Sequence, residues 1–134
     1  MLMTGQCLCG DISYDIRAEP LLTGVCHCKN CQRQAGSAFS ILIGVPKAAV
    51  TVQGTPKQYE DTADSGKPVF RQFCGNCGSP LFSLVPDAPD LMFVKAGTLD
   101  DTSMLKPQAH YWCDSAQDWI DIDPAVLQCA KNPA

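Results

Sequence analysis

The chain has 134 residues, of which 10 are Lys or Arg and 14 are Asp or Glu, giving a formal net charge of −4. The basic residues are scattered, which argues against a nucleic-acid-binding surface. No apolar run approaches the roughly 20 residues of a membrane span, so we expect no membrane association. The length suits a single domain, which we expect to occupy residues 1–134.

The opening segment, residues 1–6, has neither the basic region nor the apolar stretch of a secretory signal peptide. We therefore expect a cytoplasmic protein whose thiols stay reduced. In such a compartment, clustered cysteines bind metals more often than they form disulfides. The disulfide alternative would require export by a route of which the sequence gives no sign.

Ten prolines and ten glycines interrupt the chain, so long helices are not expected. Ile12, Tyr14 and Ile16 alternate with polar residues over 11–17, as on a half-buried strand. Only 29–35 has helical character, and Gly36 would end that helix. The further expected strands, in chain order, are 38–45, 50–52, 58–62, 68–73, 81–85, 91–95 and 109–112. Together these elements predict a mostly β fold with at most short helical turns.

Seven of the nine cysteines fall into three tight clusters. The clusters are Cys7 and Cys9, then Cys26, Cys28 and Cys31, then Cys74 and Cys77. Thiols one or two residues apart are poorly placed to bridge each other, yet both can reach one small cation. Zinc takes four ligands at the corners of a tetrahedron, so seven thiols divide naturally into four plus three. The spacing predicts two zinc ions.

The first and last clusters are the candidates for a structural zinc. On an extended segment Cys7 and Cys9 would point to the same face. Cys74 and Cys77 enclose a Gly-Asn turn of the zinc-knuckle type, whose residues adopt the backbone dihedrals that bring both sulfurs inward. Each pair supplies half of a tetrahedron, and four thiolates leave the metal coordinatively full.

The middle cluster predicts a different kind of centre. Cys26, Cys28 and Cys31 can occupy three corners of a tetrahedron and leave the fourth open. Such a metal is a Lewis acid, which makes these three cysteines the candidate catalytic residues as well as zinc ligands. His27 lies between two ligands and should point the opposite way, so we expect it to pack rather than to bind the metal. Lys29 and Arg33 lie beside the cluster, where they would offset its negative charge or hold an anionic substrate; the simpler alternative is ordinary solvated surface.

A rival division of the ligands remains open at this point. It joins two cysteines of the middle cluster with Cys74 and Cys77 and leaves Cys7 and Cys9 without a role. The lone Cys113 and Cys129 are most simply small buried apolar groups, although the aromatic segment 109–112 beside Cys113 is suited to line a pocket.

The order of these motifs resembles a known family, the glutathione-dependent formaldehyde-activating enzymes, which also includes centromere protein V. The resemblance covers residues from Gly5 to about Ile122, the expected core of the domain. It is carried by Gly5-Gln6-Cys7-Leu8-Cys9-Gly10, Cys26-His27-Cys28-Lys29-Asn30-Cys31, Phe73-Cys74-Gly75-Asn76-Cys77-Gly78, Val94-Lys95-Ala96-Gly97-Thr98-Leu99-Asp100-Asp101, Pro107, His110, Trp112 and Trp119.

The resemblance implies small twisted antiparallel sheets stapled by zinc. It assigns the structural zinc to Cys7, Cys9, Cys74 and Cys77 and the catalytic zinc to the middle cluster. It also implies a carbon–sulfur lyase whose substrate is a small thiol–aldehyde adduct. In the founding activity glutathione is the co-substrate, and its addition to formaldehyde gives S-hydroxymethylglutathione in formaldehyde detoxification.

The alternative function is a non-catalytic zinc-binding module that recognises another protein. The acidic surface and the aromatic residues Tyr111, Trp112 and Trp119 fit this alternative. A second metal with four protein ligands would favour it, because a closed coordination shell cannot take a substrate.

Overall fold

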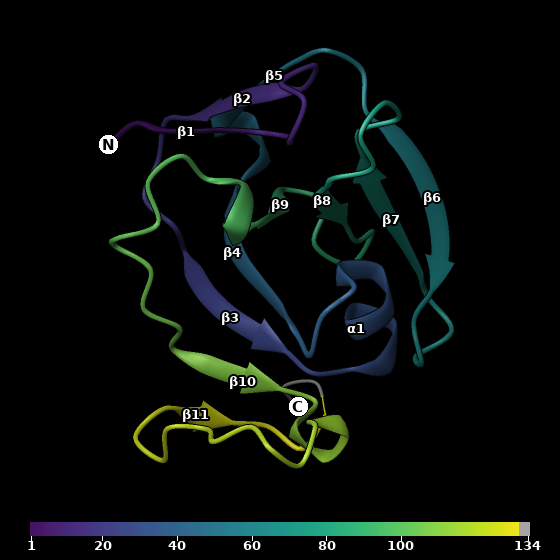
Figure 1. Cartoon of the computed structure of the whole chain (residues 1–134), viewed down its shortest axis with the longest axis vertical. Helices are drawn as coiled ribbons and strands as arrows, with labels where there is room; N and C mark the ends of the chain where they lie inside the picture. Colours follow the sequence, from purple (N-terminus) through teal and green to yellow (C-terminus); the bar gives the residue numbers. More distant parts are fainter. Residues whose placement is uncertain (132–134) are drawn as a thin grey trace.

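The computed structural model describes residues 1–131, which form two β-sheets and one α-helix (Figure 1). The small sheet has the strand order β1-β2-β5, and the large sheet has the order β11-β10-β3-β4-β9-β8-β7-β6. The strands are β1 (Met3–Gln6), β2 (Ser13–Ile16), β3 (Leu22–Cys26), β4 (Ser40–Pro46), β5 (Val50–Gln53), β6 (Lys57–Thr62), β7 (Pro68–Phe73), β8 (Pro80–Leu84), β9 (Leu91–Lys95), β10 (Ala109–Tyr111) and β11 (Leu127–Gln128). Short 3-10 turns are η1 (Lys47–Ala49), η2 (Ala96–Thr98) and η3 (Cys113–Ser115).

The mostly β fold expected from the sequence is confirmed, with one difference in strand direction. The small sheet is antiparallel throughout, and so are β3, β4 and the strands from β6 to β9. However, β10 runs parallel to both β3 and β11. The long connection from β9 to β10 passes back along the molecule (Figure 1), and this reversal allows β10 to run in the direction of β3.

The main core lies on one face of the large sheet, between it and the small sheet. Ile43, Phe82 and Val94 point into this core and are fully buried. From the small sheet, Tyr14 and Ile16 meet them, as the alternation over 11–17 predicts. Tyr14 packs edge-on against Phe82 with ring centroids 5.3 Å apart. This packing leaves the opposite face of the large sheet available for a site.

The strand register defines that opposite face. Leu22 pairs with Gly44, Gly44 with Phe93, Phe93 with Ser83, and Ser83 with Arg71. Residues paired across antiparallel strands point to the same side, so this row lies on one face. Gly44 is required there, because a Cβ would lie 2.9 Å from Leu22 Cγ and 3.4 Å from a ring carbon of Phe93.

The single α-helix of residues 1–131, α1 (Lys29–Ala35), is where the sequence predicts it. Cys28 is the N-cap, and its sulfur accepts a hydrogen bond of 3.2 Å from the backbone N–H of Cys31. The helix ends at Gly36 with φ of 62°, a left-handed conformation that glycine adopts without strain. Both ends of the helix are thus determined by residues next to it in the sequence.

Three strands, β1, β3 and β11, are not predicted by the sequence pattern. In β3 the apolar alternation is interrupted by Gly24, and the reason lies elsewhere in the chain. A Cβ at this position would lie 2.8 Å from a ring carbon of Tyr111, which covers the glycine from β10. The two residues of β11 are too few to give a periodic signal. Among residues 1–131, no helix is long and apolar enough to cross a membrane.

Candidate metal centres and active site

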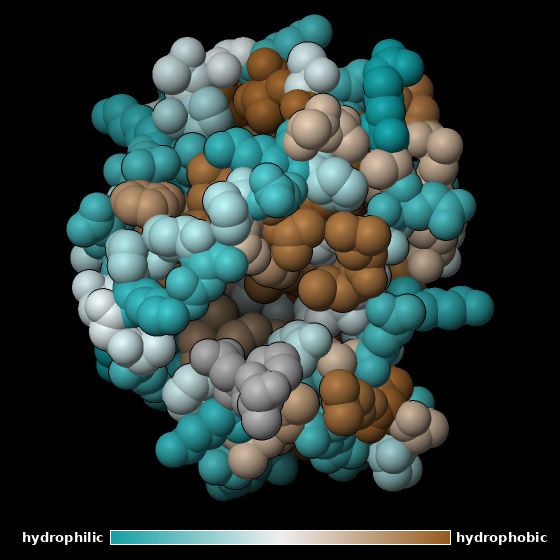
Figure 2. Space-filling view, turned by 180° about the vertical axis from the view of Figure 1, so that it is seen from behind, coloured by the Kyte–Doolittle hydropathy of each residue, from teal (hydrophilic) through white to brown (hydrophobic). Residues whose placement is uncertain are grey.

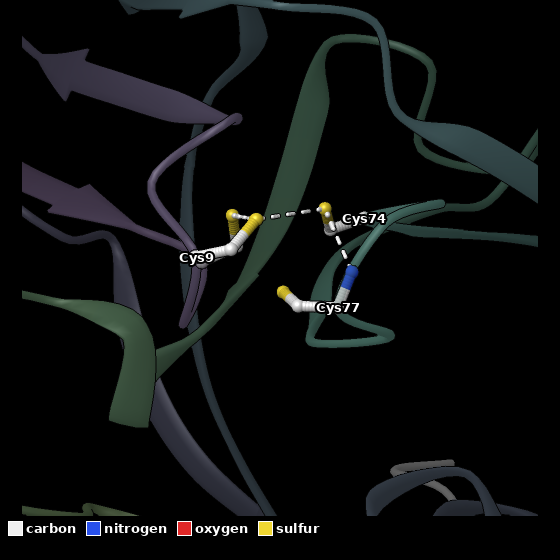
Figure 3. Close-up of side chains that lie close together, drawn as sticks. Cys9, Cys74 and Cys77 are labelled. Carbon is white, nitrogen blue, oxygen red and sulfur yellow. Dashed lines mark hydrogen bonds between the residues drawn. The ribbon is translucent and has the colours of Figure 1, made fainter.

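Four cysteines from distant parts of the chain meet between the two sheets. Cys7 and Cys9 follow β1, whereas Cys74 and Cys77 lie in the turn between β7 and β8. Their four sulfur atoms lie within 4.8 Å of one another and are called here the four-sulfur group. The sulfur of Cys9 lies 3.7 Å from that of Cys7 and 3.7 Å from that of Cys74 (Figure 3).

Two backbone turns aim these sulfurs at one point. After Cys7 the chain turns, with the Gly10 N–H donating to the Cys7 carbonyl at 3.2 Å and Gly10 at φ of 83°. The expectation of an extended segment here is therefore wrong, and the turn brings the two thiols together. On the other side, the Gly78 N–H donates to the Cys74 carbonyl at 2.8 Å, and the N–H groups of Asn76 and Cys77 each lie 3.4 Å from the Cys74 sulfur.

The four-sulfur group has the dimensions of a zinc site. Four sulfurs at the usual Zn–S distance of about 2.3 Å form a tetrahedron with edges of about 3.8 Å. The sulfur–sulfur distances of 3.7 Å match this edge, and all four cysteines are free thiols. The Ser79 hydroxyl, 3.2 Å from the Cys77 sulfur, lowers the pKa of Cys77 to about 5, which favours the thiolate form that binds metals.

The middle cluster forms a second group, at the junction of β3 and α1. Cys26 ends β3, Cys28 caps the helix, and Cys31 lies in its first turn. Their three sulfur atoms also lie within 4.8 Å of one another and are called here the three-sulfur group. Hydrogen bonds with Cys26 and Cys28 lower the pKa of Cys31 to about 3, whereas the pKa of Cys26 is raised. The group therefore carries negative charge that a cation would neutralise.

The structure groups the seven cysteines as the four-plus-three division predicts, and the rival division does not form. Within residues 1–131, no fourth His, Cys, Asp or Glu side chain joins the three-sulfur group. His27 is fully buried and is not part of the three-sulfur group, as expected. Its ring packs against Phe39, and its Nε2 lies 2.8 Å from Nδ1 of His110.

Two buried cations, Lys95 and Arg71, accompany the three-sulfur group, and neither was predicted to have a role there. Lys95 is 6% exposed, and its Nζ donates to Ser40 Oγ at 2.7 Å. Burial lowers the pKa of Lys95 to about 8, against the opposing effect of the Cys31 charge. Arg71 is 8% exposed and donates from Nε to Asp61 at 2.9 Å. Lys29 and Arg33 are both exposed, in agreement with the solvated-surface alternative. In the sequence, Lys95 could have been singled out because it is a lysine at the end of the apolar run 91–95.

A cavity of about 420 Å³ opens beside the three-sulfur group, on the face of the large sheet opposite the main core. The surface is hollowed there, and hydrophobic side chains gather around the hollow (Figure 2). All three sulfur-bearing residues line the cavity. Its apolar lining includes Leu22, Leu42, Val69, Val85, Phe93 and Tyr111. The expectation that 109–112 lines a pocket is met by Tyr111 and Trp112, whereas Cys113 is not part of the lining.

One polar side chain in this lining has no hydrogen-bond partner. Ser83 is 5% exposed, and its Oγ is buried without a partner among the described residues. A buried hydroxyl left unpaired costs stability, so a group that could bond to it from the cavity would be favoured. Ser83 thus lies in the cavity wall with its hydroxyl covered and unpaired.

The C-terminal part contains Cys113 and Cys129, which were expected to be small buried groups, and the aromatic residue Trp119. Cys129 is held in place, with its N–H donating to the His110 carbonyl at 2.8 Å and its carbonyl accepting from Cys113 N–H at 3.0 Å. Both cysteines are half-buried free thiols outside the two sulfur groups. Trp119 is 71% exposed and lies outside the cavity lining.

Comparisons with known proteins agree with the motifs. The sequence model of the family described as glutathione-dependent formaldehyde-activating enzyme matches residues 2–115. Relatives in Aspergillus flavus and Aspergillus oryzae, provisionally named as such enzymes, are each 30% identical over 107 residues, or 76% of this chain. The chain spans 56% of the length of these two relatives. An uncharacterized lyase of Schizosaccharomyces pombe is 24% identical over 118 residues. The match covers 88% of this chain and 83% of the length of that lyase.

The fold also has a likeness among solved structures. The crystal structure of a Rhodobacter sphaeroides protein matches with a TM-score of 0.58, covering 78% of this chain and 92% of that one. The two sequences are 20% identical, so this likeness concerns the fold alone.

Proposed function

The chain belongs to the glutathione-dependent formaldehyde-activating enzyme family, and on this basis we propose that it is a carbon–sulfur lyase acting on the adduct of a thiol and an aldehyde. The observation that carries the proposal is the three-sulfur group in the wall of a cavity, without a fourth protein ligand in residues 1–131. A closed group of four ligands at this place would instead favour the protein-interaction module.

We propose a division of labour between the two sulfur groups. Cys7, Cys9, Cys74 and Cys77 hold a structural zinc that ties the small sheet to the large one. Cys26, Cys28 and Cys31 hold a second zinc, which when bound supplies a Lewis acid with one open coordination position. The converging thiols at metal-ligand spacing support both assignments.

The reaction itself is a reversible addition. The thiol sulfur forms a bond to the carbonyl carbon, and the thiol proton ends on the carbonyl oxygen, which becomes a hydroxyl; cleavage reverses these changes. The walls of the cavity hold the two reactants together and exclude water. Ser83 is part of this lining and its hydroxyl has no partner. We propose that the hydroxyl turns toward the bound reactants and donates a hydrogen bond to the aldehyde oxygen, where negative charge develops. Ser83→Ala should therefore lower kcat without lowering metal content.

The test compares zinc-loaded wild-type protein with Cys28→Ser. Serine is a good helix N-cap, so the cap of α1 survives while a metal ligand is lost. Adduct formation is followed by exchange NMR, with formaldehyde and either glutathione or benzyl mercaptan. We expect wild-type protein to exceed the spontaneous rate with at least one pair, and Cys28→Ser to fall back to it. Cys113→Ser, outside both groups, is the matched control. Equal rates for wild type and Cys28→Ser with both pairs would refute the proposal.

A further inference from the structure

The chemistry of the cavity wall narrows the class of substrate. Strand alternation places Leu22, Gly24 and Cys26 on the same side of β3, so the apolar wall leads along one strand to the first cysteine of the three-sulfur group. Phe93 and Leu42 continue this wall on β9 and β4. Leu22, Leu42 and Phe93 are half-buried, and the strand register places them on the face of the sheet that lines the cavity.

Each cation of the cavity lining has a carboxylate partner. Two cations line the cavity within residues 1–131, namely Lys67 and Arg71. Lys67 Nζ lies 2.6 Å from Asp87, and Arg71 Nε lies 2.9 Å from Asp61. Asp64 adds a further negative charge at the lining. The cavity therefore presents no excess of positive charge to a ligand.

Glutathione fits this wall poorly. The tripeptide carries two carboxylates and one ammonium group, and a carboxylate removed from water without a cation partner is strongly disfavoured. The cations on α1, Lys29 and Arg33, are exposed and do not line the cavity.

We propose that the cavity takes an uncharged thiol–aldehyde adduct whose organic group is apolar, an aliphatic chain or an aromatic ring, in preference to an adduct of glutathione. This inference rests on the proposed lyase function, because the sulfur and the carbonyl carbon of the substrate must reach the three-sulfur group. The apolar group then packs against Leu22, Val85 and Phe93, and burial of its surface supplies the binding free energy.

The experiment measures binding separately from the reaction. Benzyl mercaptan and glutathione both present a primary alkyl thiol, so their difference reports the rest of the molecule. Each is titrated into the zinc-loaded protein by calorimetry without aldehyde. We expect benzyl mercaptan to bind at least roughly tenfold more tightly. Equal binding, tighter glutathione binding or no measurable binding of benzyl mercaptan would overturn the inference.

A charge added to the wall provides the matched pair of variants. Val85 is half-buried, lies just after β8 and lines the cavity. Val85→Arg should weaken benzyl mercaptan binding and strengthen glutathione binding, each by roughly tenfold. Leu21→Arg adds the same charge at a 63% exposed position outside the lining and should change neither. If Val85→Arg leaves both affinities unchanged, the thiols bind elsewhere and the inference fails.

The two proposals can fail independently. Tight binding of benzyl mercaptan without any acceleration of its reaction with formaldehyde would refute the lyase function and leave the chemistry of the cavity as described. Acceleration with glutathione that exceeds the acceleration with benzyl mercaptan would support a lyase and overturn the inferred preference.

Discussion

Lys95 donates a hydrogen bond of 2.7 Å from Nζ to the hydroxyl of Ser40, a buried contact between β9 and β4. Ser40 is the register partner of Cys26 across β3 and β4, so the bond fixes the ammonium group next to the three-sulfur group. Three thiolates around a divalent cation leave a net charge of −1. A buried ammonium group close by stabilises that charge.

Lys95→Met should weaken zinc binding at the three-sulfur group by roughly tenfold, or about 1.4 kcal/mol. The substitution keeps an unbranched side chain and removes only the charge and the bond to Ser40. A chelator competition that resolves the two zinc ions measures the effect. Lys106→Met, at an exposed position, is the control. If Lys95→Met and Lys106→Met both release the more weakly bound zinc at the same chelator concentration as wild type, Lys95 does not stabilise the charge of the three-sulfur group.

The two metals should differ in their effect on stability. We expect wild-type protein to hold two zinc ions per chain by elemental analysis. Cys9→Ser should lower the free energy of unfolding on the order of 5 kcal/mol, because the four-sulfur group joins β1 to the β7–β8 turn and structural zinc supplies about 10 kcal/mol in small modules.

Cys28→Ser provides the comparison, since it should lose one zinc and retain most of the stability. Denaturant unfolding of both variants measures the difference. A larger loss of stability in Cys28→Ser than in Cys9→Ser would contradict the assignment of the structural site.

Alkaline pH should destabilise the core through Tyr14. Burial raises the pKa of Tyr14 to about 12, and its hydroxyl lies 2.7 Å from that of Thr98. Between the unfolded pKa of about 10 and the folded pKa, only the unfolded chain loses the proton. The stabilising contribution is therefore complete below pH 10 and disappears as the pH rises toward 12, a loss on the order of 2 kcal/mol.

Denaturant unfolding at pH 8, 10.5 and 11.5 checks this dependence. Tyr14→Phe should show a smaller decline over this range than wild type. Tyr59→Phe, at a 63% exposed position, should decline as the wild type does. Identical slopes for the two variants would show that another group controls alkaline unfolding.

Gly5 and Gly97 differ in whether the surrounding structure leaves room for a side chain. A Cβ on Gly5 would overlap the phenol ring of Tyr14 and lie 2.6 Å from the Thr98 carbonyl oxygen, whereas nothing lies within 4 Å of a Cβ on Gly97. Gly5→Ala should destabilise the protein by about 1–3 kcal/mol, because β1 must move away from β2. Gly97→Ala should cost less than about 0.5 kcal/mol. Chemical denaturation of both variants decides the point.

The local signals predicted their elements well. The helix at 29–35 ends at a glycine that adopts the left-handed conformation, and the alternation over 11–17 identifies the buried side of β2. The prediction of β3 failed because a distant residue decides there, since Gly24 interrupts the strand pattern where Tyr111 covers it. The Cys7–Cys9 segment turns rather than extends because of a local bond from Gly10 N–H to the Cys7 carbonyl.

The sequence by itself determined which side chains could hold a metal, since ligand chemistry and short spacings within each cluster are local properties. Only the tertiary structure decided what surrounds them. Sheet register and burial, which depend on contacts between strands far apart in the chain, place Lys95 and Arg71 near the three-sulfur group, neutralise Arg71 with Asp61 and leave Ser83 unpaired in an apolar wall.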